Sequence, residues 1–409
     1  MSLIISLIPQ VLYSFFTIFK KWFFWLLILV VGLLYRKMTA SSRYLFKMPG
    51  ESPWRLTMMS VFFGILGGFL GSIILIFVGI SVNEIGGMYL FFTALALMLI
   101  QQRFMCFAYA GGLLSLSYLF FGVPQLSVPH VIALVAVLHL IESLLIYLTG
   151  SIYPSPVYLS KGKGRVVGGY NLQKFWPLPL IVLFVGFYPD PEIIKGAVSM
   201  PSWWPLITPE FTAGRSEIVY SLVAIPALLG YGDIAMTTTP KQKTHLAALE
   251  LAGYSVVLLV LAILASHYHP VAYVAALFSP LGHELLIYIG QRREKKGEPL
   301  YVPTEKGIKL LYVQRGSIFA KIGIKSEDVL LTLNDTQLYC DEDIEEILME
   351  GTNIVRLEYL CKKTGERKKA TIECGDLKSL GYISVPTRHA FPYLYFATSM
   401  SLLKKWCKK

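Results

Sequence analysis

The chain has 409 residues, of which 55% are hydrophobic and only 15% are charged. Soluble proteins carry charge on about a quarter of their residues, so this composition excludes an ordinary soluble protein. More than half of the charged residues follow position 290. This uneven placement predicts a polytopic α-helical membrane domain over 1–290, a small soluble domain over 297–386 and a basic tail over 387–409. The local patterns described below make the soluble domain α+β and the tail amphipathic.

Runs of about 20 mostly apolar residues predict helices that cross a membrane, and we count eight or nine such runs. Residues 1–18 form either an interfacial helix or part of a tilted first span, and we interpret them as retained rather than cleaved. The runs cover residues 19–35, 55–80, 86–101, 104–122, 128–149, 176–189, 217–231, 246–267 and 271–290.

The gaps between these runs alternate in charge. Every second gap is basic, and the gaps between the basic ones are neutral or acidic, as the positive-inside rule requires. This alternation predicts a cytoplasmic location for the 36–55 loop and for everything after Gly290. The basic gaps are 36–55, the gap at Arg103, 160–174, 237–245 and 291–298.

The formal net charge of +11 does not indicate a nucleic-acid partner, since no aromatic and basic nucleic-acid motif is present. Basic residues beside a membrane favour anionic lipid, and the tail suits an interfacial helix on such a surface. The cysteines show no ligand spacing, so we interpret them as free thiols in a reducing compartment. They are Cys106, Cys340, Cys361, Cys374 and Cys407.

The stretch GILGGFLGS within the second run places Gly64, Gly67, Gly68 and Gly71 at helical spacing. Small residues let helix backbones approach closely in a membrane. We therefore expect a packing seam, within the protein rather than between two copies of it.

The stretch GHELL near residue 283 contains a His-Glu pair on a predicted helix. A zinc-protease helix needs a second His four residues later, and Ile287 stands there. No other histidine pair has recognisable ligand spacing, so we predict no catalytic residue, no metal and no cofactor. We expect Glu284 to pair with Arg292 or Arg293, and we expect local hydrogen bonds of His139 and Glu142 to lock helix packing, in preference to a proton path.

After residue 300 the pattern predicts a strand, a short helix over 318–321, a second strand, an amphipathic helix capped by Asp341, and a hairpin with its turn around Thr364 and Gly365. The segment GSIFAKIGIKSEDVLLTLND resembles the signature of bacterial PDZ domains. The stretch SLGYISVP at 379–386 resembles the circularly permuted PDZ domains of site-2 proteases, in which the carboxylate-binding strand comes last.

PDZ domains bind an extended peptide by adding a strand to an open edge beside a helix. The resemblance implies a peptide-binding edge at Gly381, Tyr382, Ile383 and Ser384. Helix residues Ile344, Ile347 and Leu348 either face the groove or fill the domain core. Ser384 and Pro386 depart from an ideal edge, so an internal peptide or a loop is an alternative ligand to a free carboxylate.

A multi-span membrane domain with one C-terminal, cytoplasmic PDZ domain resembles the MinJ family of Firmicutes, the topological determinants of the division site. The resemblance implies a membrane adaptor without enzyme activity at the septum and cell poles, which links a DivIVA-like scaffold to a MinD-like ATPase. Two alternatives remain from other classes. One is a degenerate site-2-protease relative that regulates membrane proteolysis, and the other is a small-solute transporter with a regulatory PDZ domain.

Overall fold

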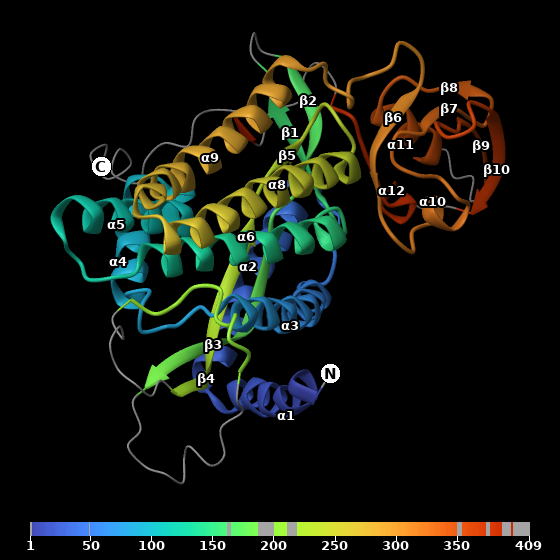
Figure 1. The fold of residues 1–409 in the computed structure, drawn as a ribbon. Coiled ribbons are helices and arrows are strands. Elements are labelled where there is room, and N and C mark those ends of the chain that lie inside the picture. The colour runs from blue at the N-terminus through green and yellow to red at the C-terminus, as the bar shows by residue number, and fades with distance from the viewer. Residues whose placement is uncertain are drawn as a thin grey trace.

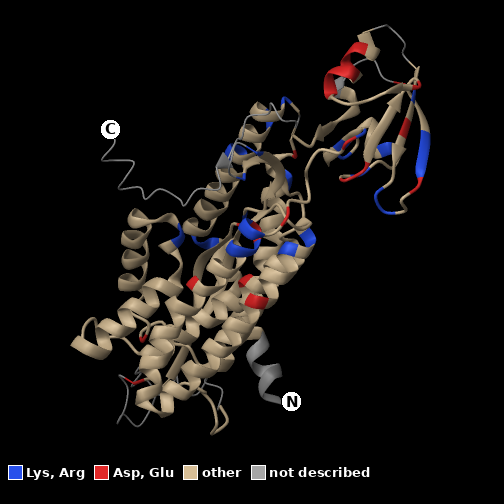
Figure 2. Ribbon diagram, turned by 90° about the horizontal axis from the view of Figure 1, so that it is seen from above, with Lys and Arg blue, Asp and Glu red and all other residues tan. Residues whose placement is uncertain are grey.

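The protein was analysed as a computed structural model. It describes residues 2–48, 50–161, 165–186, 200–210, 219–349, 354–373, 377–386 and 394–395. A helical domain is followed by a sheet-rich C-terminal domain, drawn in orange and red in Figure 1. Charged residues gather in the C-terminal domain and at the adjoining end of the helical domain, while the long helices carry few of them (Figure 2).

Five helices in the described part of the chain are long and apolar enough to cross a membrane. They are α2 (Trp22–Phe46), α3 (Pro53–Val78), α6 (Val128–Thr149), α8 (Pro240–His267) and α9 (His269–Lys296). The described part of the helical domain also has three shorter α-helices, α1 (Ser2–Thr17), α4 (Gly87–Ile100) and α5 (Phe107–Phe121). Helix α6 lies at the centre, since α3, α5, α8 and α9 all contact it.

Two predicted spans are not helices, and this corrects the count of eight or nine. Residues 176–189 and 217–231 fall largely within β3 (Lys174–Gly186) and β4 (Val219–Tyr231), which pair as a long antiparallel hairpin. At about 3.4 Å per residue, each 13-residue strand is roughly 44 Å long. A hairpin returns the chain to the same side of the membrane from which it started, as a pair of spanning helices would. The alternation of basic gaps therefore could not distinguish the two structures.

Strand β3 turns every second backbone group away from β4, toward the surrounding helices and loops. Lipid offers such groups no hydrogen-bond partner. At the odd-numbered positions from 175 to 185, the chain itself leaves no backbone N–H group without an acceptor. Two of these positions are Pro177 and Pro179, which have no N–H. The other N–H groups donate to Tyr35 Oη, Ser72 Oγ, the Ile80 carbonyl and Asn83 Oδ1.

The glycines of α3 form the predicted seam within the protein. A Cβ atom at Gly64 would lie 2.3 Å from the Pro177 carbonyl oxygen, and one at Gly68 would lie 2.4 Å from that of Pro179. Gly67 and Gly71 face Ile141 on α6, whose side-chain atoms would lie 3.2 Å from a Cβ atom at either glycine. The four glycines therefore let α3 pack closely against β3 on one side and α6 on the other.

The opposite face of α3 is apolar and exposed. Its large side chains are outside while its glycines and serines are inside, the reverse of a helix in a soluble protein. Such an arrangement suits a helix surrounded by lipid. The exposed residues are Phe62, Leu66, Leu70, Ile73 and Phe77.

The C-terminal domain contains the predicted strands and helices in the predicted order. Its sheet has the order β10-β9-β7-β6-β11, with β8 paired to β7. The strands are β6 (Ile308–Val313), β7 (Val329–Leu333), β8 (Thr336–Gln337), β9 (Ile354–Leu360), β10 (Arg367–Glu373) and β11 (Tyr382–Ser384). The helices are α10 (Ile318–Lys321), α11 (Asp341–Met349) and α12 (Leu377–Leu380). A separate hydrophobic core lies within this domain, around Leu310, Phe319, Leu330 and Val355.

A small sheet connects the two domains. Its order is β12-β1-β2-β5, formed by β1 (Ser155–Ser160), β2 (Val166–Asn171), β5 (Ile234–Ala235) and β12 (Leu394–Tyr395). Strand β12 comes from the predicted tail and pairs in parallel with β1. The rest of 387–409, including the Lys residues expected on lipid, lies outside the described residues.

Glu294, near the end of α9, fixes this junction. Its buried carboxylate accepts hydrogen bonds from the backbone N–H groups of Met236 and Thr237, at 3.0 and 2.9 Å. Lys243 of α8 forms ion pairs with Glu294 at 3.5 Å and with Asp233 at 3.2 Å. The start of α8 and the end of α9 are therefore held together where the chain leaves the helical domain.

Candidate peptide-docking site

Strand β11 is the last strand of the C-terminal sheet. The Gly381 carbonyl accepts from Gln314 N–H, and Val385 N–H donates to the Lys309 carbonyl, both at 2.8 Å. Odd-numbered residues therefore face β6, and Tyr382 and Ser384 turn their backbone groups to the other side. No strand in the described part of the chain pairs with β11 on that side. The predicted binding residues thus occupy a sheet edge, which is the geometry that strand addition requires.

Gly381 is required by the backbone at the start of this edge. Its φ is +66°, in the left-handed region that favours glycine. A Cβ atom there would lie 2.3 Å from Cβ of Ser317, and Ser317 caps α10 by accepting from Ala320 N–H at 3.2 Å. A side chain at 381 would therefore disturb the fold of the domain, whatever its effect on a ligand.

One side of β11 is tied to helix α11 through Asp341. The hydroxyls of Tyr382 and Ser384 both donate to the Asp341 carboxylate, the former at 3.0 Å. Burial raises the pKa of Asp341, and the bonds from Ser384 and Tyr382 oppose part of that rise. Burial beside the same carboxylate also raises the pKa of Tyr382. Strand β11 and the first turn of α11 are thus joined by these two hydrogen bonds.

Asp341 does not cap the helix in the way that the sequence predicted. Asp341 is itself the first residue of α11, and Asp343 in the same turn reaches back to the segment before the helix, where its carboxylate accepts from the backbone N–H groups of Tyr339 and Cys340 at 2.6 and 3.0 Å. These bonds hold the pKa of Asp343 below its usual value, although desolvation opposes them. Asp341 is therefore free to bind β11, a long-range role that local pattern could not reveal.

The three helix residues expected at the groove differ in their surroundings. Ile344 and Ile347 belong to the hydrophobic core of the domain, and Leu348 packs against that core while half-buried. Ile344 and Ile347 therefore fill the domain core, which was one of the two roles considered for them. Contact of any of the three with a peptide stays a prediction.

The other side of β11 faces the helical domain. Ile383 and Val385 are buried in a cluster with Tyr170, Leu172 and Tyr301, which join the small sheet to the C-terminal domain. The Tyr158 hydroxyl of β1 donates to the Ser384 carbonyl at 2.9 Å. One acceptor of the edge is therefore already occupied from within the same chain.

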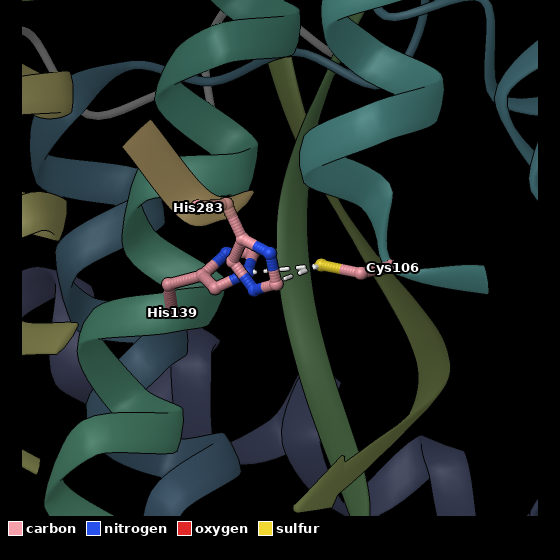
Figure 3. A group of neighbouring side chains, drawn as sticks. All are labelled: Cys106, His139 and His283. Atoms are coloured by element: carbon pink, nitrogen blue, oxygen red, sulfur yellow. Dashed lines mark hydrogen bonds between the residues drawn. The ribbon is translucent and has the colours of Figure 1, made fainter. Parts of the chain in front are cut away.

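A second group of polar side chains lies inside the helical domain, and no motif in the sequence predicted it. Cys106 directly precedes α5, His139 is on α6 and His283 is on α9. Their Sγ and imidazole nitrogen atoms all lie within 4.8 Å of one another, as Figure 3 shows. Separations of 33 and 177 residues match no local ligand spacing, so only the helix packing brings these residues together.

Glu284 does not pair with Arg292 or Arg293. It forms an ion pair with Arg103 at 3.0 Å and accepts a hydrogen bond from Tyr109 Oη at 2.6 Å. Arg293 instead pairs with Glu250 on α8. Partners eight or nine residues along one helix lie two turns away, whereas Arg103 and Tyr109 come from a neighbouring segment in direct contact with α9.

His139 makes the expected local hydrogen bond, although to a backbone group. Its Nδ1 donates to the Val135 carbonyl at 2.7 Å. The opposite edge of the ring faces Cys106, with Nε2 at 3.1 Å from Sγ. His139 therefore both bonds to its own helix and belongs to the Cys-His cluster, of which it is the buried member.

No protein-family model matches this chain. The chain is similar to the cell division topological determinant MinJ of Bacillus subtilis (strain 168), with 23% identity over 233 residues. The match covers 57% of this chain and 55% of that protein, so the chain spans about half the length of the curated relative. The relationship is a distant one to a cell-division protein.

Proposed function

We propose that this protein is a membrane adaptor that places division proteins at the septum and cell poles and has no catalytic activity of its own. Two independent features support the proposal. The chain is distantly similar to a cell division topological determinant, and its apolar helical domain is joined to a C-terminal domain with a sheet edge that no strand of the described residues pairs. The helices would anchor the protein, and the edge would bind partners.

The C-terminal domain is proposed to be a permuted PDZ domain on the cytoplasmic side. Its final strand β11 lies next to β6 and is connected to α11, and Gly381 begins the strand with a left-handed backbone. A partner strand would pair with the outward backbone groups of Tyr382 and Ser384. Because Tyr158 occupies the Ser384 carbonyl, a partner must displace that hydroxyl or pair beside it.

The proposed partners are a DivIVA-like scaffold, a MinD-like ATPase and other division proteins, together with anionic lipid. An edge of three strand residues offers few hydrogen bonds, so each contact would be weak and reversible. Weak docking suits a protein that must release partners when a new division site forms. The multi-pass anchor would supply the permanent part of the localisation.

The single observation that carries the docking proposal is the outward direction of the Ser384 backbone. Ser384→Pro removes the outward N–H while proline remains compatible with an edge strand. Ser384→Ala is the matched control, because both variants lose the hydroxyl bond to Asp341 and only the proline loses the N–H. We expect about tenfold weaker recovery of division proteins with the proline variant, consistent with the loss of one buried hydrogen bond.

The experiment is affinity capture with the full-length, epitope-tagged protein from detergent-solubilised membranes of its native host. Partners are quantified by mass spectrometry, and purified scaffold and ATPase homologues are then tested by direct binding. Equal recovery of division proteins by the wild type and both variants would move the docking site away from β11. Recovery of none by the wild type would contradict the adaptor function itself.

A further inference from the structure

We propose that Cys106, His139 and His283 form a binding site for one zinc ion, or for another divalent ion that prefers thiolate and imidazole ligands. These side chains come from three separate segments that meet inside the helical domain (Figure 3). Thiolate sulfur and imidazole nitrogen are the ligands that zinc selects in proteins. The proposal replaces the sequence expectation that no metal is bound, and it is independent of the proposed adaptor function.

The distances between the candidate ligand atoms agree with tetrahedral coordination. Zinc–sulfur and zinc–nitrogen bonds of about 2.3 and 2.0–2.1 Å at a tetrahedral angle place sulfur and nitrogen roughly 3.6 Å apart. Cys106 Sγ lies 3.1 Å from His139 Nε2 and 3.7 Å from His283 Nε2. Small side-chain adjustments would therefore suffice for all three atoms to coordinate one ion, with the fourth position left for water.

Hydrogen bonds fix which ring nitrogen of each histidine is available. His139 Nδ1 lies 2.7 Å from the Val135 carbonyl, which can only accept, so Nδ1 carries the proton. Tyr109 Oη gives its single proton to Glu284, so at 3.3 Å it accepts from His283 Nδ1. In both neutral rings Nε2 then has a lone pair, and both lone pairs face the same sulfur.

A neutral thiol alone leaves one of these two nitrogen atoms without a proton from Cys106. Cys106 has one S–H proton, so it can donate to one of the two Nε2 atoms at a time. His139 is almost fully buried, at 3% exposure, which makes an unsatisfied nitrogen there costly. A bound cation with a cysteine thiolate would satisfy both nitrogens and the sulfur at once.

The groups behind the ligands form the supporting contacts that metal sites usually have. A backbone carbonyl orients His139, and the series Arg103, Glu284 and Tyr109 orients His283. Carboxylates and carbonyls on the second histidine nitrogen typically contribute 10- to 100-fold to metal affinity. Glu284 thus acts on His283 Nδ1 through the Tyr109 hydroxyl, as a positioning residue.

The position of the Cys106, His139 and His283 cluster would let an ion reach it from water and would let a bound ion stabilise the helix packing. Arg103 and Glu284, next to the cluster, are about one-third exposed, so water reaches the neighbourhood of the ligands. The ligands connect the start of α5 with α6 and α9, and these three helices contact one another. A bound ion would tie these three helices together and stabilise the helical domain.

The test uses the full-length protein in detergent, stripped with chelator and titrated with Co²⁺ and then with Zn²⁺. We expect one Co²⁺ per chain with a thiolate-to-cobalt charge-transfer band, displacement by Zn²⁺, and a higher unfolding midpoint with metal. Cys106→Ser removes the band, and His139→Gln and His283→Gln abolish stoichiometric binding. Cys340→Ser and His267→Gln are the controls, since both residues lie outside the cluster, and they retain the wild-type affinity.

Tyr109→Phe and Glu284→Gln test the positioning role without removing a ligand. We expect both variants to keep one ion per chain at saturation, with an affinity reduced by about 10- to 100-fold. These variants also cover the case in which a ligand variant fails to fold. Absence of a stoichiometric ion in the wild type, or the same affinity and absorption band in Cys106→Ser, would overturn the proposal.

Discussion

Single residues in this protein act mainly by allowing or preventing close backbone approach. Gly68 of α3 lies against the Pro179 carbonyl of β3, and no larger residue fits there without displacing backbone. The sequence identified this position from glycine spacing alone. It could not identify the partner, because the helix was expected to pack on other helices.

Gly68→Leu is therefore expected to destabilise the helical domain. Overpacking a tight contact typically costs about 1–3 kcal/mol, and a Cβ at 2.4 Å from a backbone oxygen cannot be relieved by a rotamer change. Gly253→Ala on α8 is the control, since a Cβ there meets nothing within 4 Å, and alanine favours a helix by up to about 1 kcal/mol. The thermal midpoint of the protein in detergent should fall for the first variant only, and equal midpoints would contradict the seam.

Asp341 couples the stability of the C-terminal domain to pH. Its pKa is raised by burial, so the folded domain holds the proton more tightly than the unfolded chain does. This stabilising contribution is fully present below the ordinary carboxyl pKa of 3.8 and is lost as the pH rises through the raised folded value. At neutral pH the ionised carboxylate therefore gives the domain less stability than the protonated form does.

We expect urea denaturation of a 297–386 fragment, whose core is its own, to show this contribution as a difference between variants. The wild-type free energy of unfolding should decrease more steeply than that of Asp341→Asn between about pH 4 and pH 7. The other titrating groups are shared, so they cancel in the comparison. Parallel curves for the two proteins would show that Asp341 titrates normally.

At the scale of secondary structure, the β3–β4 hairpin is the feature that the sequence analysis missed. Both segments are apolar runs of 13 to 15 residues, a length at which buried strands and helices share the same pattern. Pro177 and Pro179 in the first segment and Pro226 in the second were the available signals against a helix. The two outward prolines in β3 now have an explanation, because an edge position without N–H needs no partner.

Ser72 tests the hydrogen bonding of this edge. Its hydroxyl accepts from Ile181 N–H at 2.8 Å, so Ser72→Ala leaves a buried N–H without a partner. We expect a loss of about 1–3 kcal/mol in unfolding free energy and faster amide exchange at Ile181. Ser255→Ala is the control, because the equally buried Ser255 hydroxyl bonds only to Leu251 of its own helix in the described structure. If Ser72→Ala and Ser255→Ala lowered the unfolding free energy by the same small amount, the outward edge of β3 would not depend on the Ser72 hydroxyl.

At the scale of the whole molecule, the division into an apolar N-terminal domain and a charged C-terminal domain followed from composition and charge placement. The C-terminal strands and helices followed from local alternation, Gly323 and the turn at Gly365, whose φ values of +88° and +70° support tight turns. Contacts between residues far apart in the sequence could not be predicted from such local patterns. The Cys106, His139 and His283 cluster and the contact of Asp341 with β11 exist only after distant segments pack.

The same limit applies to the candidate docking edge. The residues Gly381 to Ser384 were identified from a resemblance, and the structure places Tyr382 to Ser384 on the edge strand β11, with Gly381 directly before it. Their contacts with Tyr158 and with the Tyr170 cluster depend on how the C-terminal domain meets the small sheet. No local sequence pattern predicts the contact between the C-terminal domain and the small sheet. The sequence therefore could not show that the candidate docking edge is partly occupied by its own chain.

The central claim is that this molecule acts by placing other proteins at the division site. The most direct measurement is time-lapse fluorescence of a functional fusion expressed from its native locus, combined with deletion of the gene. We predict foci at nascent septa and poles, and misplaced or missing septa after deletion. Uniform membrane fluorescence through the cell cycle, with normal division after deletion, would contradict the account.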